Sequence, residues 1–504
     1  MSSLSSTPDA RSTSVLRRMP PDEVLGLGSR AKQGLSQIYG RGDLVVFGLG
    51  VMIGAGIFNI AGRQAATIAG PGVILSFMIA GIASLLVALC YAELASAMPV
   101  SGSAYTFTYV VFGEMWAWIV GCALIVELEL AAASVARAWS LYAAQTLADL
   151  GVQVPALGGK AVGPDLFTLA ILTVLTFVVA FNARVGLRVL WVMVGAKLVA
   201  ITAVIVVGAR HVDAANLASI PADPLPLARD ADVLHSTLFG LTFGQAHAFG
   251  WLGILAAAPA IVFAYVGFDL VATTAEETRD APRVVPQGMI RSLAITTVIY
   301  IAVAAVMVGM VRYTEISLET PLGNAFRAVG EHFMVHVINI GAVLGLTTVI
   351  LVLLVSQTRV VFAMARDGLL PRSLGRLTGR HQTPATASLI SGAAAILLAE
   401  LAPVLTMEQL VVMGTLFAFL FVAAGVIALR RRMPELPASF RTPLFPLVPV
   451  LAILATLWLM VNLQVITWIY FAVCMAGAVL LYLLYGRRAS LLAPPPPGRG
   501  RHRR

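Results

Sequence analysis

The stretch Ile53-Gly54-Ala55-Gly56-Ile57 places two glycines near the middle of an apolar run that extends over residues 44–66. Glycine in a helix interior costs about 1 kcal/mol relative to alanine, so this stretch predicts a break in a helix. A second break is predicted at Phe263-Ala264-Tyr265-Val266-Gly267-Phe268-Asp269, which follows Pro259 and carries a carboxylate inside the apolar run 252–276. Irregular backbone at membrane depth is tolerated only where it is buried in protein or lines a wet cavity.

The composition is that of an integral membrane protein. Of the 504 residues, 59% are hydrophobic and 12% are charged, whereas soluble proteins have about 25% charged residues. A helix needs roughly 20 mainly apolar residues to cross the hydrocarbon core. We therefore predict an all-α integral membrane protein with about twelve transmembrane helices. The predicted spans are 44–66, 71–97, 115–147, 165–181, 187–209, 252–276, 286–311, 332–362, 384–402, 405–429, 444–463 and 465–486.

The loop charges predict how the chain crosses the membrane. With both termini on one side, that side holds 26 Lys and Arg residues and the opposite loops hold five. Because Lys and Arg accumulate in cytoplasmic loops, we expect a multi-pass protein of the plasma (inner) membrane with both termini cytoplasmic. Residues 1–42 and the basic residues 487–504 are predicted to be disordered. The net charge of +9 fits topology and anionic lipid, so no nucleic-acid partner is expected.

The two breaks lie five helices apart, which indicates two inverted five-helix repeats with discontinuous helices 1 and 6. Paired interruptions of this kind point to a substrate site between the unwound segments of a transporter. We predict a transporter core over residues 43–430, with repeats at about 43–210 and 250–430, and two additional helices over 444–486. The alternative is that the glycines only form a close-packed seam between helices.

The breaks offer groups that match the two charges of an α-amino acid. Freed N-H groups at the start of the following half-helix suit a carboxylate, above all those of Ala55 and Gly56. Free carbonyl groups at the ends of the first half-helices, around Met52 and from Phe263 to Val266, suit an ammonium group. The substrate-binding residues predicted on the two breaks are Met52, Ile53, Gly54, Ala55, Gly56, Ile57, Phe263, Ala264 and Val266.

Several motifs, taken in their order along the chain, identify a family. They are Gly54-Ala55-Gly56-Ile57-Phe58, Cys90-Tyr91-Ala92-Glu93-Leu94 with Pro99 and Ser101-Gly102-Ser103-Ala104-Tyr105, Ala136-Arg137-Ala138-Trp139-Ser140, Gly267-Phe268-Asp269 with Ala272-Thr273-Thr274-Ala275-Glu276-Glu277, and Arg366-Asp367-Gly368-Leu369-Leu370-Pro371. On these motifs the chain resembles the amino acid, polyamine and organocation superfamily, specifically the bacterial type of its cationic amino acid transporter branch. The resemblance covers about residues 41–485.

The resemblance implies two inverted five-helix repeats plus two extra helices, which move amino acids by alternating access. It implies that the glycine turn at Ala55 and Gly56 binds the substrate carboxylate, and that Phe263 forms part of the gate over the substrate. Glu127 matches an acid of the third helix near the pocket and is added to the substrate-binding residues. Asp269 matches an acid of the sixth helix.

Two residues are predicted to couple transport to protons. Lys197 lies near the middle of the fifth helix, where an unpaired ammonium group is expensive. Relatives with a lysine here are expected to use it in place of a sodium ion, which favours protons over sodium. The alternative is a fixed lysine that donates to first-helix carbonyls and only joins the helices. Asp269 is either a second proton carrier or the cap of the outgoing half-helix.

Several other charges leave alternatives open. Glu129, two residues beyond Glu127, faces a different side of the helix, so it is open which of the two acids faces the pocket. Arg137 is expected to form a structural ion pair. Glu276 and Glu277 either latch a cytoplasmic gate or, more commonly at such positions, are solvated acids at the membrane interface.

Two polar residues beyond the first break and three cysteines are the remaining candidate functional residues inside the predicted spans. Arg63 and Asn59 either line an outer vestibule or mark the membrane interface. The cysteines Cys90, Cys122 and Cys474 have no metal-ligand spacing, so we expect no metal site and no cofactor.

The sequence thus predicts a secondary active transporter that imports amino acids, cationic or small neutral or both, with protons. An exchanger of one amino acid for another would share every motif. A non-transporting amino acid sensor is the weaker alternative, because it would need a soluble output domain. No enzyme is expected, since the chain has no HExxH motif and no convincing serine and histidine pair at membrane depth. The expected partners are the amino acid, protons and the bilayer, and a small single-span accessory protein is left open.

Overall fold

The structure is a computed structural model of the chain. It describes residues 17, 37–54, 56–149, 151–152, 163–181, 183–218, 220–226, 234, 236–243, 247–318, 320–377, 383–490 and 492. The ends predicted to be disordered, 1–42 and 487–504, lie largely outside these residues. Residues 37–42 belong to the predicted start, yet the structure describes them: Ile38 and Tyr39 donate backbone hydrogen bonds to the Glu277 carbonyl, and Arg41 and Gly42 begin the first helix.

The first repeat begins with a broken helix. It consists of α2 (Arg41–Met52), then η1 (Gly56–Ile60), α3 (Ala61–Gln64) and η2 (Ala65–Ala69). A turn at η3 (Gly70–Gly72), where Gly70 has a φ of 60°, reverses the chain into the second helix. The remaining helices of this repeat are α4 (Val73–Ala97), α6 (Glu114–Asp149), α7 (Leu166–Phe181) and α8 (Ala183–Gly208).

The second repeat also begins with a broken helix, α11 (Gly250–Tyr265) followed by η6 (Asp269–Glu277). It continues with α12 (Ala281–Met310), α14 (His332–Arg366), α15 (Ala385–Leu401) and α16 (Val404–Arg432). The two additional helices are α17 (Leu447–Val461) and α18 (Val465–Leu481), the latter extended by η9 (Tyr482–Gly486). Both predicted breaks are therefore present, and each predicted span has its helix.

Twelve crossings follow from the lengths of these helices. Within the described residues, eight helical segments are long and apolar enough to span a membrane, and one of them, Arg41–Ala97, contains two crossings joined by the Gly70 turn. The shorter apolar helices α7, α15 and α17 supply three more. Side chains that point away from the bundle are apolar, as at Val192, Val199 and Phe333, so the surface suits lipid.

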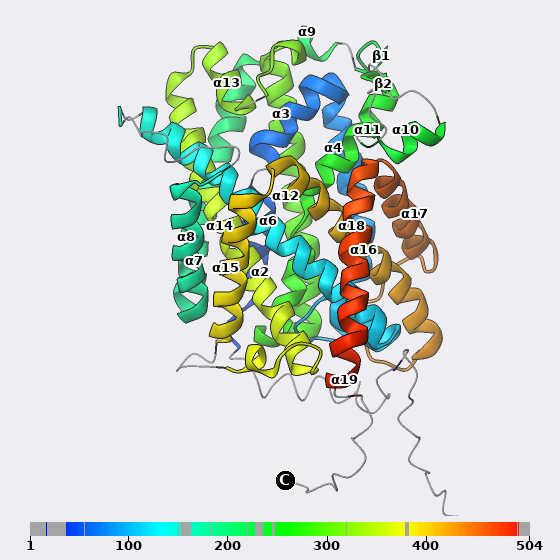
Figure 1. Cartoon of the computed structure of the whole chain (residues 1–504). Coiled ribbons are helices and arrows are strands. Elements are labelled where there is room, and N and C mark those ends of the chain that lie inside the picture. The colour runs from blue at the N-terminus through cyan, green and yellow to red at the C-terminus, as the bar shows by residue number, and fades with distance from the viewer. Residues whose placement is uncertain are drawn as a thin grey trace, which may run out of the picture.

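Packing follows the repeat symmetry. Equivalent helices of the two repeats lie against each other: α4 packs on α12, α6 on α14, and α7 on α15. The core between them contains the two broken helices, and Figure 1 shows the crossings gathered into one bundle. This arrangement brings the two breaks, about two hundred residues apart in sequence, into the centre of the molecule.

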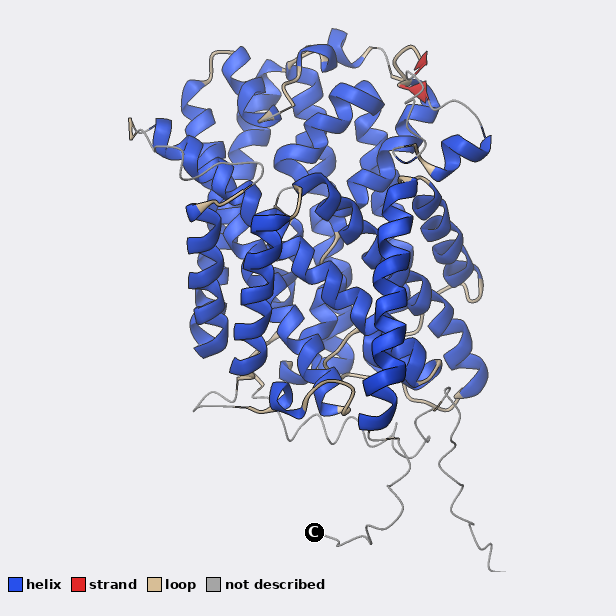
Figure 2. Cartoon of the chain, viewed as in Figure 1, coloured by secondary structure: helices blue, strands red, loops and turns tan. Residues whose placement is uncertain are grey.

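Several short elements outside the twelve crossings were not predicted. They are α5 (Ala104–Val111), η4 (Ala209–His211), α9 (Ala214–Leu217), α10 (Leu238–Phe243), η7 (Tyr313–Glu315), α13 (Pro321–Ala328), η8 (Arg372–Gly375), α19 (Arg487–Ala489) and an antiparallel pair of two-residue strands, β1 (Leu225–Pro226) and β2 (His247–Ala248). Figure 2 shows these strands as the small exception in a helical molecule. We call the end that carries α9, α13 and the strands the α13 end, and the end that carries α19 the tail end.

Candidate substrate site at the two broken helices

The first break separates α2 from η1. At Ile53 the backbone leaves the helical region (φ −77°, ψ 89°), and the Ile57 N-H donates to the Gly54 carbonyl at 3.3 Å. Ala55, one of the two predicted carboxylate donors, lies outside the described residues. Gly56 is described and begins the outgoing helix, so its N-H stands at a helix start, where an anion is favoured.

The second break is a tight turn after Tyr265. Gly267 has a φ of 122°, a conformation that residues with a side chain rarely adopt. The Gly267 N-H donates to Asp269 Oδ1 at 3.2 Å, and Asp269 is buried. This contact satisfies an N-H group that the broken helix leaves free, and it holds the shape of the turn.

The two breaks are pressed against each other. A Cβ atom added to Gly56 would lie 2.3 Å from the Cβ of Ala264, and one added to Gly267 would lie 2.3 Å from a methyl of Val51. Since real carbon atoms do not approach so closely, only glycine fits at these two positions. The close-packed seam and the paired break, which the sequence leaves as alternatives, are thus two aspects of one arrangement.

Lys197 lies beside the first break. Its buried ammonium group donates to the carbonyls of Gly50 (2.8 Å) and Ile53 (2.9 Å) and to Thr348 Oγ1 (3.0 Å). All three protons of the ammonium group are therefore used, and two carbonyls freed at the end of α2 find a donor. Lys197 joins α8 to the broken helix and to α14.

Tyr300 is a functional candidate that sequence reasoning missed. Its buried hydroxyl on α12 contacts the carbonyls of Met52 and Ala264, one from each broken helix, and the Ala264 distance is 2.9 Å. Both carbonyls were predicted to face the substrate amine, and the structure shows them already in contact with a protein hydroxyl. The available signal was a tyrosine in the middle of an apolar helix, since a buried Tyr hydroxyl usually has a partner.

A small cavity lies between the broken helices. Its volume is about 20 Å³, and it is lined by Val51, Met52, Gly56, Ala131, Val135, Phe263, Val266, Val349, Leu353 and Val411. A space of this size has room for about one water molecule, so the centre is nearly closed in this state. Of the predicted binding residues, Met52, Gly56, Phe263 and Val266 line this central cavity.

A larger cavity of about 230 Å³ lies at the α13 end. We call this cavity the vestibule. Arg63 lines it, as one of the two interpretations of this residue requires, whereas Asn59 is not among the lining residues. Phe263 lines both cavities. It therefore stands between the vestibule and the centre, the position that a gate requires.

The two third-helix acids point to different neighbours. Glu127 is fully buried and accepts a hydrogen bond from Thr415 Oγ1 of α16 at 2.6 Å. Glu129 is also buried and lies near Gln357 of α14. Neither is among the residues that line the central cavity, although Glu127 is close enough to Asp269 for an electrostatic interaction.

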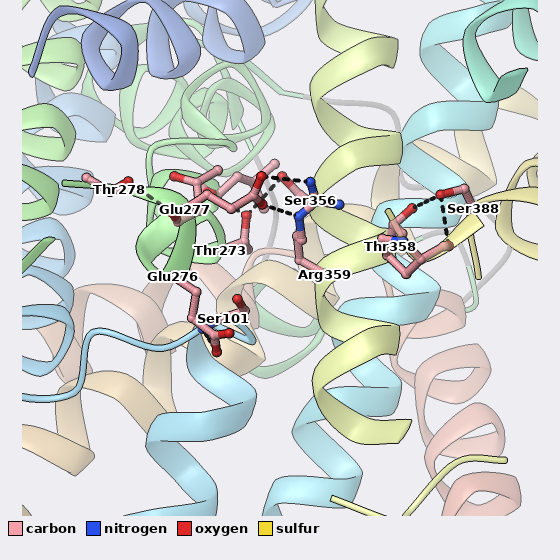
Figure 3. A network of polar contacts seen from close by, with 12 residues as sticks. Ser101, Thr273, Glu276, Glu277, Thr278, Ser356, Thr358, Arg359 and Ser388 are labelled. Carbon is pink, nitrogen blue, oxygen red and sulfur yellow. Dashed lines mark hydrogen bonds and ion pairs between the residues drawn. The ribbon is translucent and has the colours of Figure 1, made fainter. Parts of the chain in front are cut away.

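At the tail end, two buried acids form ion pairs with arginines of α14. Figure 3 shows Glu277 of η6 meeting Arg359 of α14 through both carboxylate oxygens, with the second contact at 3.2 Å. Glu276 contacts Arg366 at 3.0 Å and accepts from the Ser101 N-H at 2.8 Å. Both acids are 3% exposed, so their interpretation as solvated interfacial acids is wrong. The two carboxylates can be buried because each has a cationic partner on α14.

Arg137 lies away from the site and is structural. It forms ion pairs with Asp165 (3.7 Å) and Glu400 (3.3 Å) and donates to the Ala399 carbonyl at 2.7 Å. These contacts join α6 to α15 and to the segment before α7. The predicted structural ion pair is confirmed.

The fold and the site together define a class, that of membrane transporters with inverted five-helix repeats and two broken helices. The profile of the amino acid permease family matches residues 41–484, so the chain belongs to this family, within the amino acid, polyamine and organocation superfamily. The family members in question are permeases and transporters, which are not enzymes.

Curated relatives agree with this assignment. The chain is 37% identical to the branched-chain amino acid permease BcaP of Bacillus subtilis (strain 168), covering 83% of this chain and 86% of the relative. It is 36% identical to the methylthioribose transporter of the same organism, with the same coverage. It is 34% identical to cationic amino acid transporter 4 of Mus musculus, over 72% of this chain and 55% of that protein. The chain is therefore a multi-pass membrane protein of an amino acid transporter family.

Proposed function

We propose that this protein imports neutral aliphatic amino acids together with protons. The observation that carries the proposal is the juxtaposition of the two breaks, with the Gly56 N-H at a helix start and an apolar cavity beside it. The first feature suits the α-carboxylate that all amino acids share, and the second suits the side chain. In this role Met52, Ile53, Gly54, Ala55, Gly56, Ile57, Ala264 and Val266 contact the substrate backbone, and Phe263 is the gate.

The lining of the central cavity favours an aliphatic side chain over a cationic one. In the described part of the chain, the residues that line it include Ala131, Val135, Val349, Leu353 and Val411 and no charged residue. Burying a cationic side chain among them would cost far more than burying a branched alkyl group. Glu127, the acid that would attract a cation, is instead bonded to Thr415. The similarity to a branched-chain amino acid permease supports the same choice.

A competition experiment tests the substrate class. Purified protein in proteoliposomes should take up labelled leucine, and excess valine or isoleucine should suppress the uptake, while lysine and arginine should not. The same order should appear in a thermal-shift screen against the twenty amino acids, since a ligand at 100 times its Kd stabilises by about 2.7 kcal/mol. Stabilisation by cationic amino acids alone would contradict the aliphatic assignment.

Proton coupling rests on Lys197. A buried ammonium group that holds two carbonyls of the broken helix stands where a coupling cation would act, because losing a proton would remove its charge and one of the three N-H donors that fix the break. Asp269 and Glu127, which interact electrostatically, are the second candidate proton site. Lys197→Ala should leave leucine binding partly intact and abolish the pH dependence of uptake. Unchanged pH dependence in this variant would contradict the role of Lys197.

One experiment separates import from exchange. Empty vesicles and vesicles preloaded with leucine are compared for uptake of labelled leucine under an inward proton gradient, with a pH-sensitive dye inside. Import with protons predicts uptake into empty vesicles and acidification of their lumen. Uptake that requires preloaded amino acid would instead establish an exchanger. Binding without uptake in either preparation would favour a sensor.

The proposal includes the orientation of the protein in the membrane. The tail end carries most of the arginines of the loops, so we assign it to the cytoplasm, with both termini there and the protein in the plasma membrane. The α13 end then faces outside. In that orientation the ion pairs of Glu276 and Glu277 close the cytoplasmic side, while the vestibule stands on the outer side of Phe263.

A further inference from the structure

The vestibule has a lining that differs from that of the central cavity. It lies among the outer part of the first broken helix, α11, the start of α16 and the link between α17 and α18. Its polar lining residues include Arg63, Gln64, Glu408, Gln409, Asn462 and Gln464. Its floor is Phe263, and part of its wall is apolar through Ile60, Ala260 and Val412.

Two opposite charges face this space without pairing. Arg63 and Glu408 are both half-buried and both line the cavity. They are close enough to interact electrostatically, yet no ion pair within 4.0 Å joins them in the described part of the chain. A gap therefore separates a guanidinium from a carboxylate, in surroundings less polar than water, where such charges gain most from a ligand that bridges them.

An unsatisfied amide stands beside them. Gln64 Oε1 is buried and has no hydrogen-bond partner among the described residues. Gln64 lies next to Arg63 on α3 and lines the same cavity. A buried acceptor without a donor costs roughly 1–3 kcal/mol, and a ligand with N-H groups would remove that cost. The polar side of the vestibule thus offers a cation, an anion and a free acceptor.

This set matches the charges of a zwitterionic amino acid. A guanidinium binds a carboxylate through two parallel hydrogen bonds, and a carboxylate accepts from an ammonium group. The neighbouring apolar wall receives an aliphatic side chain. The vestibule has room for on the order of ten water molecules, comparable to the size of an amino acid, whereas the central cavity has room for about one.

We propose that the vestibule is a second, outer amino acid site, in which Arg63 holds the carboxylate and Glu408 the ammonium group before Phe263 moves aside. The proposal rests on the proposed transport of amino acids and adds a binding step to it. The carboxylate and ammonium groups of an incoming amino acid lose hydration water and bind these two side chains while the central cavity is still closed. Phe263 then separates the occupied vestibule from the central site that receives the substrate.

Uptake kinetics provide the first test, with labelled leucine as the probe. Arg63→Gln and Glu408→Gln should each raise the KM for leucine about tenfold and leave the maximal rate nearly unchanged, as expected when binding ahead of the transport step is lost. The control variants Arg312→Gln and Glu315→Gln, exposed at the same end, should leave both parameters unchanged. If the wild-type protein takes up leucine and both vestibule variants have the same KM as the wild type, the outer site is overturned and the proposed function stands.

Protection from labelling separates the outer site from the central one. Ala260→Cys provides a thiol in the vestibule wall, in a background with Cys122→Ala and Cys474→Ala. Ala131→Phe, added to this background, fills the central cavity and should abolish uptake. Leucine should still slow modification of the Ala260→Cys thiol when the centre is filled. Loss of that protection would mean that amino acids bind only in the centre and would overturn the proposal.

A final comparison assigns the protection to the two charges. Adding Glu408→Gln to the filled-centre protein should abolish protection by leucine, whereas adding Glu315→Gln should not. Persistent protection after Glu408→Gln and after Arg63→Gln would mean that leucine binds the vestibule through its apolar wall alone, which contradicts the zwitterion site. Absence of wild-type uptake, by contrast, would count against the proposed function itself.

Discussion

At the scale of single residues, two buried side chains donate hydrogen bonds to the broken helices. Lys197 and Tyr300 supply protons to carbonyls of the broken helices, and both side chains are buried. A hydroxyl has one proton, so Tyr300 donates to one carbonyl at a time, and the other keeps its capacity for the substrate amine. In the proposed function, Tyr300 thereby positions both half-helices for the same ligand.

Tyr300→Phe should weaken leucine binding by about tenfold and lower the unfolding free energy by about 1–3 kcal/mol, because the buried carbonyls of Met52 and Ala264 lose the one donor that they share. Leucine binding and denaturant unfolding of the purified protein provide the measurement. Tyr470→Phe, an exposed tyrosine on α18, is the matched control and should change neither quantity. Equal behaviour of the two variants would contradict the positioning role of Tyr300.

Gly56→Ala should abolish uptake and destabilise the protein by about 1–3 kcal/mol, because the new methyl group would overlap Ala264 and force the two breaks apart. Gly195→Ala on α8 is the control, since a Cβ there meets nothing within 4 Å and alanine favours a helix. Uptake assays and thermal unfolding of both variants test this. A fully active Gly56→Ala protein would show that the close approach of the breaks is dispensable.

At the scale of elements, η6 is the segment that we expect to move when the tail end opens. It is a nine-residue 3-10 helix, which is unusually long for this weaker hydrogen-bond pattern. Its last two residues hold α14 through Arg359 and Arg366, so the closed state depends on ion pairs between two elements. Opening toward the tail end must separate these partners.

Arg359→Ala should favour the state open at the tail end, because Glu277 would be left as a buried charge without its partner, at a cost of about 3–5 kcal/mol in the closed state. The measurement is the labelling rate of Ser356→Cys, a buried position one turn from Arg359, by a reagent added at the tail end. The rate should rise in Arg359→Ala and stay low in Arg372→Ala, an exposed arginine of the same end. Equal rates in the two variants would mean that the ion pair does not hold the gate.

At the scale of the whole molecule, the distribution of charge predicts the orientation. The loops of the tail end carry most of the Lys and Arg residues, and cationic loops remain in the cytoplasm during insertion. In the proposed orientation, the vestibule is the outer entrance and the ion pairs of Glu276 and Glu277 are the inner closure.

Impermeant maleimide should label Arg312→Cys on intact cells and should label Arg372→Cys only after the membrane is opened. Both positions are exposed, and they lie at opposite ends of the bundle, so each serves as the control for the other. The labelling is done in a background with Cys122→Ala and Cys474→Ala, since Cys90 is buried. The reverse labelling pattern would invert the assignment of the two ends.

The sequence by itself determined the architecture. Spans of apolar residues fix the number of crossings because lipid leaves no alternative to a helix, and glycines and Pro259 fix where two of those helices break. It also indicated the buried position of Lys197, which follows from its place in the middle of an apolar helix, whereas the gate role of Phe263 stays a prediction.

Only the tertiary structure decided the partners. Tyr300, Thr348 and Thr415 approach the site from helices remote in sequence, and no local pattern reveals that a hydroxyl will meet two carbonyls. The burial of Glu276 and Glu277 depended likewise on Arg359 and Arg366 of α14. The physical reason is that periodicity reports which face of a helix is apolar, whereas a hydrogen bond or ion pair across helices requires the positions of both partners in space.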